Sequence, residues 1–200
     1  MERMGHGKAQ WRERLTTRRI ARTGDEQASA AVRLTALIGE IESGPLGRPL
    51  RTATIAAYLP QPPEPGDTGM LDALVATGAT VIVPKVAPGP PAPLDWARYE
   101  DAGQLVVARF GLREPAGAAV GIDAVGGADV VLVPALGVDR RGVRLGRGAG
   151  YYDRTLGAAA DAALVAVVYD DELFDELPED PLDVRVGWVL RPGTGFTPLT

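Results

Sequence analysis

The stretch RLGRGAGYYD, residues 144–153, places three glycines and two arginines just before the predicted start of a helix. Its glycines can adopt positive φ angles and allow a ligand to approach the main chain. The N–H groups exposed there, together with the helix N-terminus, suit an oxyanion. Arg144 and Arg147 add forked donors that match the geometry of phosphate. The loop therefore predicts phosphate binding.

Asp153 is unexpected in such a loop because a carboxylate repels phosphate. It is accounted for if Mg²⁺ lies between them, since Mg²⁺ is commonly held by one or two carboxylates and phosphate oxygens. The alternative is a tight turn in which Asp153 complements the helix dipole. Neither standard nucleotide loop is present, because G-x-x-x-x-G-K-[ST] is absent and Gly-Arg-Gly-Ala-Gly is not G-x-G-x-x-G followed by a ribose-binding acid.

The composition narrows the chemistry further. The chain has no cysteine, and its single histidine, His6, lies near the N-terminus. Disulfides, thiolate metal sites and a cysteine nucleophile are excluded, and a Ser-His-Asp triad or a histidine zinc site is disfavoured. There is no apolar run near the roughly 20 residues that span a bilayer, and the N-terminus has no apolar signal-peptide core. We therefore expect a cytoplasmic protein without a membrane partner.

The net charge of −5 is distributed unevenly. Residues 1–22 hold seven Lys or Arg against two Glu, and residues 137–154 hold five Arg against two Asp, which leaves −13 on the remainder. Two basic segments in an acidic protein indicate a local anion rather than a long nucleic acid. For the first segment, the alternative is a solvated helix face.

The elements that must position these residues follow an alternating pattern. Helices are expected at 8–22, after the capping-box sequence Thr23–Glu26 as far as Ile41, from Asp67 or Thr68 to Val75, and from Gly150 or Tyr151. Strands are expected at 52–58, 80–84, 129–134, 164–169 and 184–190, with a strand pair at 94–99 and 104–110, loops at 111–127 and 137–149, and an acidic surface segment with one helical turn at 170–183. This order predicts an α/β fold: an open, mostly parallel sheet flanked by helices, with a basic N-terminal helical segment, in a single domain of residues 1–200.

Residues 133–139 and 144–153 together resemble the hallmark of the 5-formyltetrahydrofolate cyclo-ligase (methenyltetrahydrofolate synthetase) family. The family has V-P-x-L-G-x-D, a short turn, then R-x-G-x-G-x-G-Y-Y-D; here these are VPALGVD at 133–139 and RLGRGAGYYD. The family's Lys-x-x-x-Arg is matched by Lys8 and Arg12, and Tyr58-Leu59-Pro60 leads to an acid that aligns with Glu64. Most of the chain is covered, although residues 85–127 match only in general layout.

The resemblance implies the conversion of 5-formyltetrahydrofolate and ATP to 5,10-methenyltetrahydrofolate, ADP and phosphate, with Mg²⁺ and through a phosphorylated formyl intermediate. Such a reaction needs positioning and charge stabilisation more than acid–base chemistry. It is therefore compatible with a site that lacks histidine and cysteine. The implied partner is the small-molecule folate, and we expect a monomer.

The resemblance also implies roles for individual residues. Those implied for ATP binding are Lys8, Ala9, Gln10, Trp11, Arg12, Arg144, Leu145, Gly146, Arg147, Gly148, Ala149, Gly150, Tyr151 and Tyr152. Those implied for folate binding are Leu59, Glu64, Phe110, Tyr151 and Tyr152, while Arg147, Tyr152 and Asp153 would be catalytic and Asp153 would hold Mg²⁺. Taken alone, Lys8 also fits a solvated side chain, the tyrosine pair fits packing, and Glu64 fits an exposed loop acid.

Two positions depart from the family pattern. Ala149 stands where many members have lysine, and Gly187 stands where many have an acid that serves as a second metal contact; Asp183 is not assigned in its place. Both departures favour an alternative, a non-catalytic folate- or nucleotide-binding protein of the same fold. A relationship to phosphosugar isomerases or acyl-CoA transferases would be a fold-level analogy that leaves the Arg-Gly loop unexplained.

Overall fold

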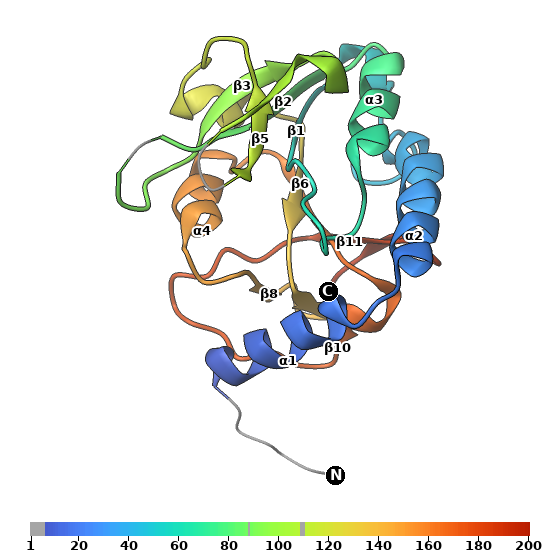
Figure 1. Cartoon of the computed structure of the whole chain (residues 1–200), viewed down its shortest axis with the longest axis vertical. Helices are drawn as coiled ribbons and strands as arrows, with labels where there is room; N and C mark the ends of the chain where they lie inside the picture. The colour runs from blue at the N-terminus through green and yellow to red at the C-terminus, as the bar shows by residue number, and fades with distance from the viewer. Residues whose placement is uncertain (1–6, 88, 109–110) are drawn as a thin grey trace.

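A seven-stranded sheet runs through the middle of the protein in the computed structural model, which describes residues 7–87, 89–108 and 111–200 (Figure 1). In spatial order the strands are β12 (Gly195–Pro198), β11 (Trp188–Arg191), β9 (Ala163–Val167), β6 (Val130–Pro134), β1 (Thr54–Ala57), β2 (Thr80–Lys85) and β3 (Asp95–Tyr99). Neighbouring strands are parallel except at the two edges, where β3 and β12 run antiparallel to their partners. The predicted open, mostly parallel α/β fold is confirmed.

The middle strand β6 has the sequence VVLVP, and its four valine and leucine residues are buried. A strand that is apolar on both faces belongs at the centre of a parallel sheet with helices on each side. β6 lies between β1 and β9, with Ala57 opposite Leu132 and Val167 opposite Pro134. The carboxyl ends of these strands therefore reach the same edge, which is where ligands collect in open α/β sheets.

Helices cover both faces of the sheet (Figure 1). On one face lie α2 (Gly24–Leu37), its 3₁₀ continuation Ile38–Ile41 and α3 (Thr68–Ala76), and on the other lie the 3₁₀ helix Ile122–Gly127, α4 (Tyr151–Thr155) and the 3₁₀ turn Leu156–Ala158. The capping box predicted before α2 is confirmed, because Thr23 and Glu26 each accept a hydrogen bond from the other's backbone N–H. Shorter 3₁₀ turns span Leu50–Thr52, Ala102–Gln104 and Asp170–Glu172.

The N-terminal helix α1 (Lys8–Ile20) packs against a small second sheet (Figure 1). That sheet contains β10 (Leu173–Phe174), β7 (Gly137–Asp139) and β8 (Arg144–Leu145). Leu15 is fully buried there, and Trp11 meets the ring of Phe174 edge-on with 4.9 Å between centroids. An apolar stripe thus fixes a helix that also carries four arginines.

Three cations of α1, together with Arg22 just after the helix, form ion pairs with the acidic segment 170–183. Arg18 and Arg22 both contact Asp171, Arg19 forms a buried ion pair with Glu172, and Lys8 contacts two further acids. A merely solvated helix face therefore does not describe Lys8 and Arg19, whose side chains are 14% and 2% exposed. Their partners lie about 150 residues or more away along the chain, so local sequence could not reveal them.

Several short elements differ from the sequence-based expectation. β3 pairs with β2 in the main sheet, whereas β4 (Leu105–Val107) pairs with β5 (Arg113–Pro115), so the predicted pairing of 94–99 with 104–110 is wrong. The expected loops at 111–127 and 137–149 contain β5 and the hairpin of β7 and β8. Strands of two or three residues are too short to show a hydrophobic period.

The end of the chain also differs from the prediction. β11 begins at Trp188 rather than Val184, and β12 follows it as an antiparallel edge strand. The sequence of β12, GFTP, contains two residues that are depleted in strands, which explains why it was not predicted. In the part of the chain that the structure describes, helices long and apolar enough to cross a membrane are absent.

Candidate active site

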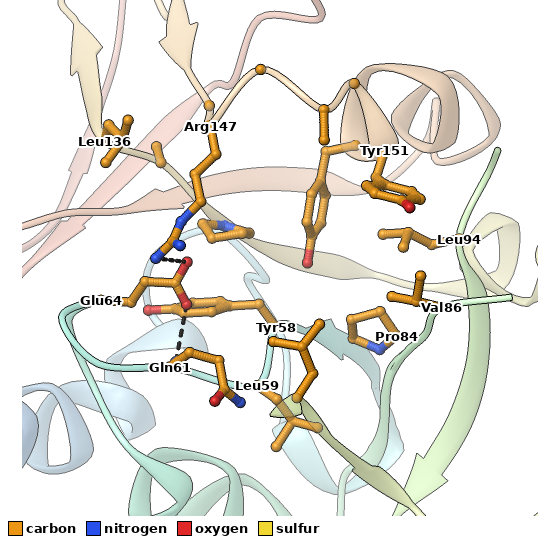
Figure 2. A pocket seen from close by; sticks show the side chains of 18 of the residues that line it. Tyr58, Leu59, Gln61, Glu64, Pro84, Val86, Leu94, Leu136, Arg147 and Tyr151 are labelled. Atoms are coloured by element: carbon orange, nitrogen blue, oxygen red, sulfur yellow. Dashed lines mark hydrogen bonds and ion pairs between the residues drawn. The ribbon is translucent and has the colours of Figure 1, made fainter. Parts of the chain in front are cut away.

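A cavity of about 340 Å³ opens where the carboxyl ends of β1, β2 and β6 meet (Figure 2). Tyr58 and Leu59 follow β1, Pro84 lies just after the buried residues of β2, and Ala135 and Leu136 follow β6. Leu94 and Val86 form an apolar wall beside Tyr151 in Figure 2. The cavity therefore lies at the edge of the sheet where ligands collect in open α/β folds.

The glycine loop between β8 and α4 forms one wall of this cavity. Gly148 has φ +95° and Gly150 has φ +74°, as the sequence predicts for a tight turn. Gly146 is constrained by space instead, because a Cβ there would lie 2.8 Å from Nη1 of Arg144. α4 has only five residues, so we expect the loop N–H groups and side-chain cations to contribute more to anion binding than the helix dipole.

Arg144 lies beneath the loop, with its side chain 4% exposed. Its Nη2 donates to Oδ1 of Asp153 at 2.5 Å, and its Nη1 donates to the carbonyl oxygen of Pro134 at 3.3 Å. Its Nε is buried without a hydrogen-bond partner among the described residues. Burial lowers the pKa of Arg144, and the Asp153 carboxylate counteracts that effect. A buried guanidinium with an unsatisfied donor beside a cavity is suited to an anionic ligand.

Two other arginines hold the loop from outside. Arg12 of α1 donates from Nε to the carbonyl oxygen of Gly146 at 3.0 Å, and its guanidinium lies against Gly148. Arg154 of α4 donates from Nη1 to the carbonyl oxygens of Ala149 and Gly150. Arg12 was predicted at this site, whereas Arg154 was not, although its position four residues after Gly150 is a signal that sequence reasoning could have used.

Lys8 is not one of the residues that line the cavity, and its ammonium group contacts two acids. Its Nζ is 2.7 Å from Asp180 and 2.5 Å from Asp183. Burial alone would lower the pKa of Lys8, but its hydrogen bonds with Asp180 and Asp183 raise it. Ala9 and Gln10 are exposed, and Trp11 packs beneath Arg14 and against Phe174.

Glu64, in the proline-rich loop after β1, faces the glycine loop across the cavity (Figure 2). Its Oε1 is 3.1 Å from Nη2 of Arg147, and its Oε2 accepts a hydrogen bond from the backbone N–H of Gln61 at 3.0 Å. The Glu64 side chain is 12% exposed, so the alternative of a simple solvated acid does not describe it. Tyr58 donates to the carbonyl oxygen of Pro65 and so helps to shape this loop.

The tyrosines at the start of α4 also line the cavity. Burial raises the pKa of Tyr152, and the nearby Glu64 carboxylate raises it further. Tyr152 is therefore a neutral phenol at physiological pH, able to donate a hydrogen bond or pack against a ring. Leu59 is 8% exposed and lines the same space, while Phe110, predicted as a further wall, lies outside the described residues.

The described residues offer few protein ligands for Mg²⁺. Within the described ranges, groups of three or more His, Asp or Glu side chains that could hold a metal are absent. The Asp153 side chain is 37% exposed, and among these residues its hydrogen bonding involves Oδ1 alone. A single carboxylate suits Mg²⁺ that is held mainly by phosphate oxygens and water. Gly187, where a second acid was expected from the family pattern, has open space around it.

Sequence reasoning also missed residues of the cavity wall and floor. Arg113 and Glu114 reach it from β5, an element that was not predicted, and Arg19 reaches it from the last turn of α1. Arg19 follows Leu15 at a helical spacing of four, which places both on the inward face of the helix. That spacing is the signal that could have identified Arg19 as buried.

Comparisons with known proteins agree with this arrangement. Residues 4–192 match the sequence profile of the 5-formyltetrahydrofolate cyclo-ligase family. A 5-formyltetrahydrofolate cyclo-ligase of Mycolicibacterium smegmatis is 52% identical over 150 residues, which cover 73% of this chain and 77% of that protein. One from Escherichia coli K12 is 28% identical over 141 residues, covering 70% and 78%.

Solved structures of 5,10-methenyltetrahydrofolate synthetases also resemble this chain. A 5,10-methenyltetrahydrofolate synthetase of Aquifex aeolicus superposes with a TM-score of 0.73 at 28% identity, covering 94% of this chain and 91% of that one. One from Mycoplasma pneumoniae, at 20% identity, shares the fold with a TM-score of 0.68. This chain is thus an α/β ligase of folate metabolism. It belongs to the 5-formyltetrahydrofolate cyclo-ligase family, which confirms the sequence-based identification.

Proposed function

We propose that the protein cyclises 5-formyltetrahydrofolate to 5,10-methenyltetrahydrofolate with consumption of ATP, in the presence of Mg²⁺. The observation that carries this proposal is one cavity with two unlike walls. The glycine loop with its arginines suits a nucleotide phosphate, and the proline-rich loop with Glu64 suits a neutral heterocycle with N–H donors. The apolar wall between them suits flat rings.

The chemistry requires activation of a poor leaving group. The formyl oxygen attacks the γ-phosphorus of ATP, and the bond from that phosphorus to ADP breaks. N10 of the folate then attacks the formyl carbon, the carbon–oxygen bond breaks, and phosphate departs with the N10 proton. The site's task is to align the two substrates and to stabilise charge on the phosphoryl oxygens.

On the nucleotide side, we assign Arg147, Arg144 and the backbone N–H groups of the loop to the phosphates of ATP. Arg12 would contact the phosphates and also hold the loop in place, and Lys8 would supply a further cation if ATP displaces its two carboxylates. The other proposed contacts to ATP are Ala9, Gln10, Trp11, Leu145, Gly146, Gly148, Ala149, Gly150, Tyr151 and Tyr152.

Asp153 is the proposed protein ligand to Mg²⁺. The ion, when bound, would neutralise charge on the phosphate oxygens. Because Asp153 is paired with Arg144 in this structure, the arrival of metal and phosphate would replace one ion pair with two separate charge pairings.

On the folate side, Glu64 would accept hydrogen bonds from the amino and ring N–H groups of the pterin. Leu59 and Tyr151 would pack against its rings, and the neutral phenol of Tyr152 would contact the formyl group. Phe110 stays a proposed wall of the folate site. We also propose, from the sequence, that the protein acts as a monomer in the cytoplasm and has no nucleic-acid partner.

The direct test is to mix the protein with 5-formyltetrahydrofolate and MgATP and to monitor the absorbance of the methenyl product. Omission of ATP or of Mg²⁺ should abolish its appearance. Binding of both substrates without any product would favour the second candidate, a binding protein that has lost turnover. Ala149 and Gly187 are the observations that favour this second candidate.

A further inference from the structure

Arg19 is a cavity-lining cation that the reaction above does not use. It lies in the last turn of α1, and its side chain is 2% exposed. Nε and Nη2 donate to the two carboxylate oxygens of Glu172 at 2.8 and 2.7 Å, and Nη2 also donates to the carbonyl oxygen of Ala135. Nη1 donates no hydrogen bond to the described residues and is not among their fully buried unpaired atoms, so it keeps some exposure in a side chain that lines the cavity.

The surroundings of Arg19 favour a neutral acceptor over a phosphate. The bidentate contact with Glu172, itself 2% exposed, already neutralises the guanidinium. The carbonyl oxygen of Ala135 accepts from Nη2, and Glu64 lines the same cavity, so an anion placed directly beside Arg19 would meet these oxygens. A carbonyl oxygen of a ring could instead accept the remaining N–H without bringing in charge.

Glu64 lies within electrostatic range of Arg19. Burial lowers the pKa of Arg19 and the ion pair with Glu172 raises it, and Glu64 and Tyr58 contribute to the rise. The cavity thus presents an acceptor, Glu64, from the loop after β1 and a donor, Arg19, from helix α1. A pterin edge carries the complementary pattern: an amino group, a ring N–H and a ring carbonyl oxygen in sequence.

We propose that Nη1 of Arg19 donates a hydrogen bond to the ring carbonyl oxygen of the bound pterin and so selects the oxo form of the folate ring. This inference rests on the proposed function. In this arrangement Glu64 accepts hydrogen bonds from the amino group and the ring N–H of the pterin, and Arg19 donates one to the ring carbonyl oxygen. In an analogue with an amino group in place of the carbonyl, that amino group and Nη1 of Arg19 are both donors. They cannot form a hydrogen bond with each other, so the N–H of Arg19 stays unpaired inside the complex.

The test compares equilibrium binding of 5-formyltetrahydrofolate with that of its 2,4-diamino analogue. Wild-type protein should prefer the oxo compound by tenfold or more. Arg19→Lys keeps a charge opposite Glu172, but a single ammonium group cannot replace the forked donors. It should reduce the preference to about threefold or less while leaving the affinity for ATP unchanged. Arg18→Lys, on the exposed side of the same helix turn, is the matched control and should keep the wild-type preference.

A purely structural role for Arg19 predicts equal loss of affinity for both folates and an unchanged preference, which would overturn the inference. If Arg19→Lys does not fold, the double variant Arg19→Met with Glu172→Gln removes both buried charges, and retention of the oxo preference there would be equally contrary. Failure of wild-type protein to bind either folate would instead overturn the proposed function itself.

Discussion

Arg147 and Glu64 form an ion pair across the mouth of the cavity, with 3.1 Å between Nη2 and Oε1. The two residues come from opposite walls, and we assign them to different substrates. Without ligands each charge therefore neutralises the other. Binding of ATP phosphates to Arg147 would free Glu64 for the pterin, so both variants below must be measured with each substrate alone and with both together.

Arg147→Ala should weaken ATP binding more than folate binding. The loss of a charge-assisted contact to phosphate corresponds to about 1.5–3 kcal/mol, or roughly 10- to 150-fold in the dissociation constant. Separate calorimetric titrations with each ligand measure this. Equal weakening of both ligands, or of neither, would count against the role assigned to Arg147.

Glu64→Gln should raise the KM for folate and leave the affinity for ATP nearly intact. The ionised acceptor becomes an amide, whose NH₂ group opposes the donors of the pterin. Steady-state kinetics with each substrate varied in turn provide the measurement. An effect on ATP alone would show that the proline-rich loop does not border the folate.

Asp153→Asn should lower the cyclisation rate strongly and shift the Mg²⁺ requirement to higher concentration. A helix-dipole role alone would give a stability change of about 0.3–1 kcal/mol. Because Asp153 also pairs with the nearly buried Arg144, we expect a somewhat larger loss, about 1–3 kcal/mol. Activity against Mg²⁺ concentration and a denaturant melt test the two parts, with exposed Asp175→Asn as control. Wild-type activity with an unchanged Mg²⁺ dependence would show that ATP and water hold the metal without Asp153.

Gly142→Ala should destabilise the protein, because Gly142 has φ +83° and a Cβ there would collide with the carbonyl oxygen of Val186. We expect a loss of at least about 1–3 kcal/mol from backbone strain. Gly157→Ala is the matched control, since its Cβ would enter open space at a helical position. Urea unfolding of both variants measures their free energies of unfolding. Similar values for the two would contradict the close approach of Gly142 to the Val186 backbone.

The pair of Lys8 and Asp183 should make stability depend on pH in the acid range. Burial alone would raise the pKa of Asp183, but its hydrogen bonds with the Asp180 backbone and Lys8 lower it. A carboxylate with a lowered folded-state pKa stabilises the fold above its unfolded pKa of about 3.9, and this contribution is lost as the pH falls through the folded value. Unfolding free energy should therefore decrease from pH 5 to pH 2, and less steeply in Lys8→Ala. Identical slopes would show that the pair does not influence folding.

The sequence predicted the elements that have strong local signals. Continuous apolar runs identified β6 and β9, the Thr23–Glu26 box identified the start of α2, and alternating glycines identified the loop before α4. The glycine loop follows the buried strand at 129–134, and ligands in open α/β sheets collect at the carboxyl ends of strands. These inferences needed only neighbouring residues.

The rest depended on contacts between distant segments. The short strands β5, β8 and β10 exist because their partners are present, and two or three residues carry no period of their own. The pairing of Arg147 with Glu64 and the burial of Arg19 likewise depend on the folded chain. Residue types identified the candidate chemistry, but the partner of each charge came from the tertiary structure.

The ion pairs between α1 and the acidic segment 170–183 also have a consequence for biosynthesis. A ribosome makes α1 about 150 residues before the acids that its cations contact. Until those acids emerge from the exit tunnel, the arginines and Lys8 of the nascent chain lack the carboxylates that they contact in the finished protein. Arg19 cannot take its place in the cavity floor before Glu172 is available. Completion of the cavity therefore has to wait until the segment that contains Glu172 has been synthesised.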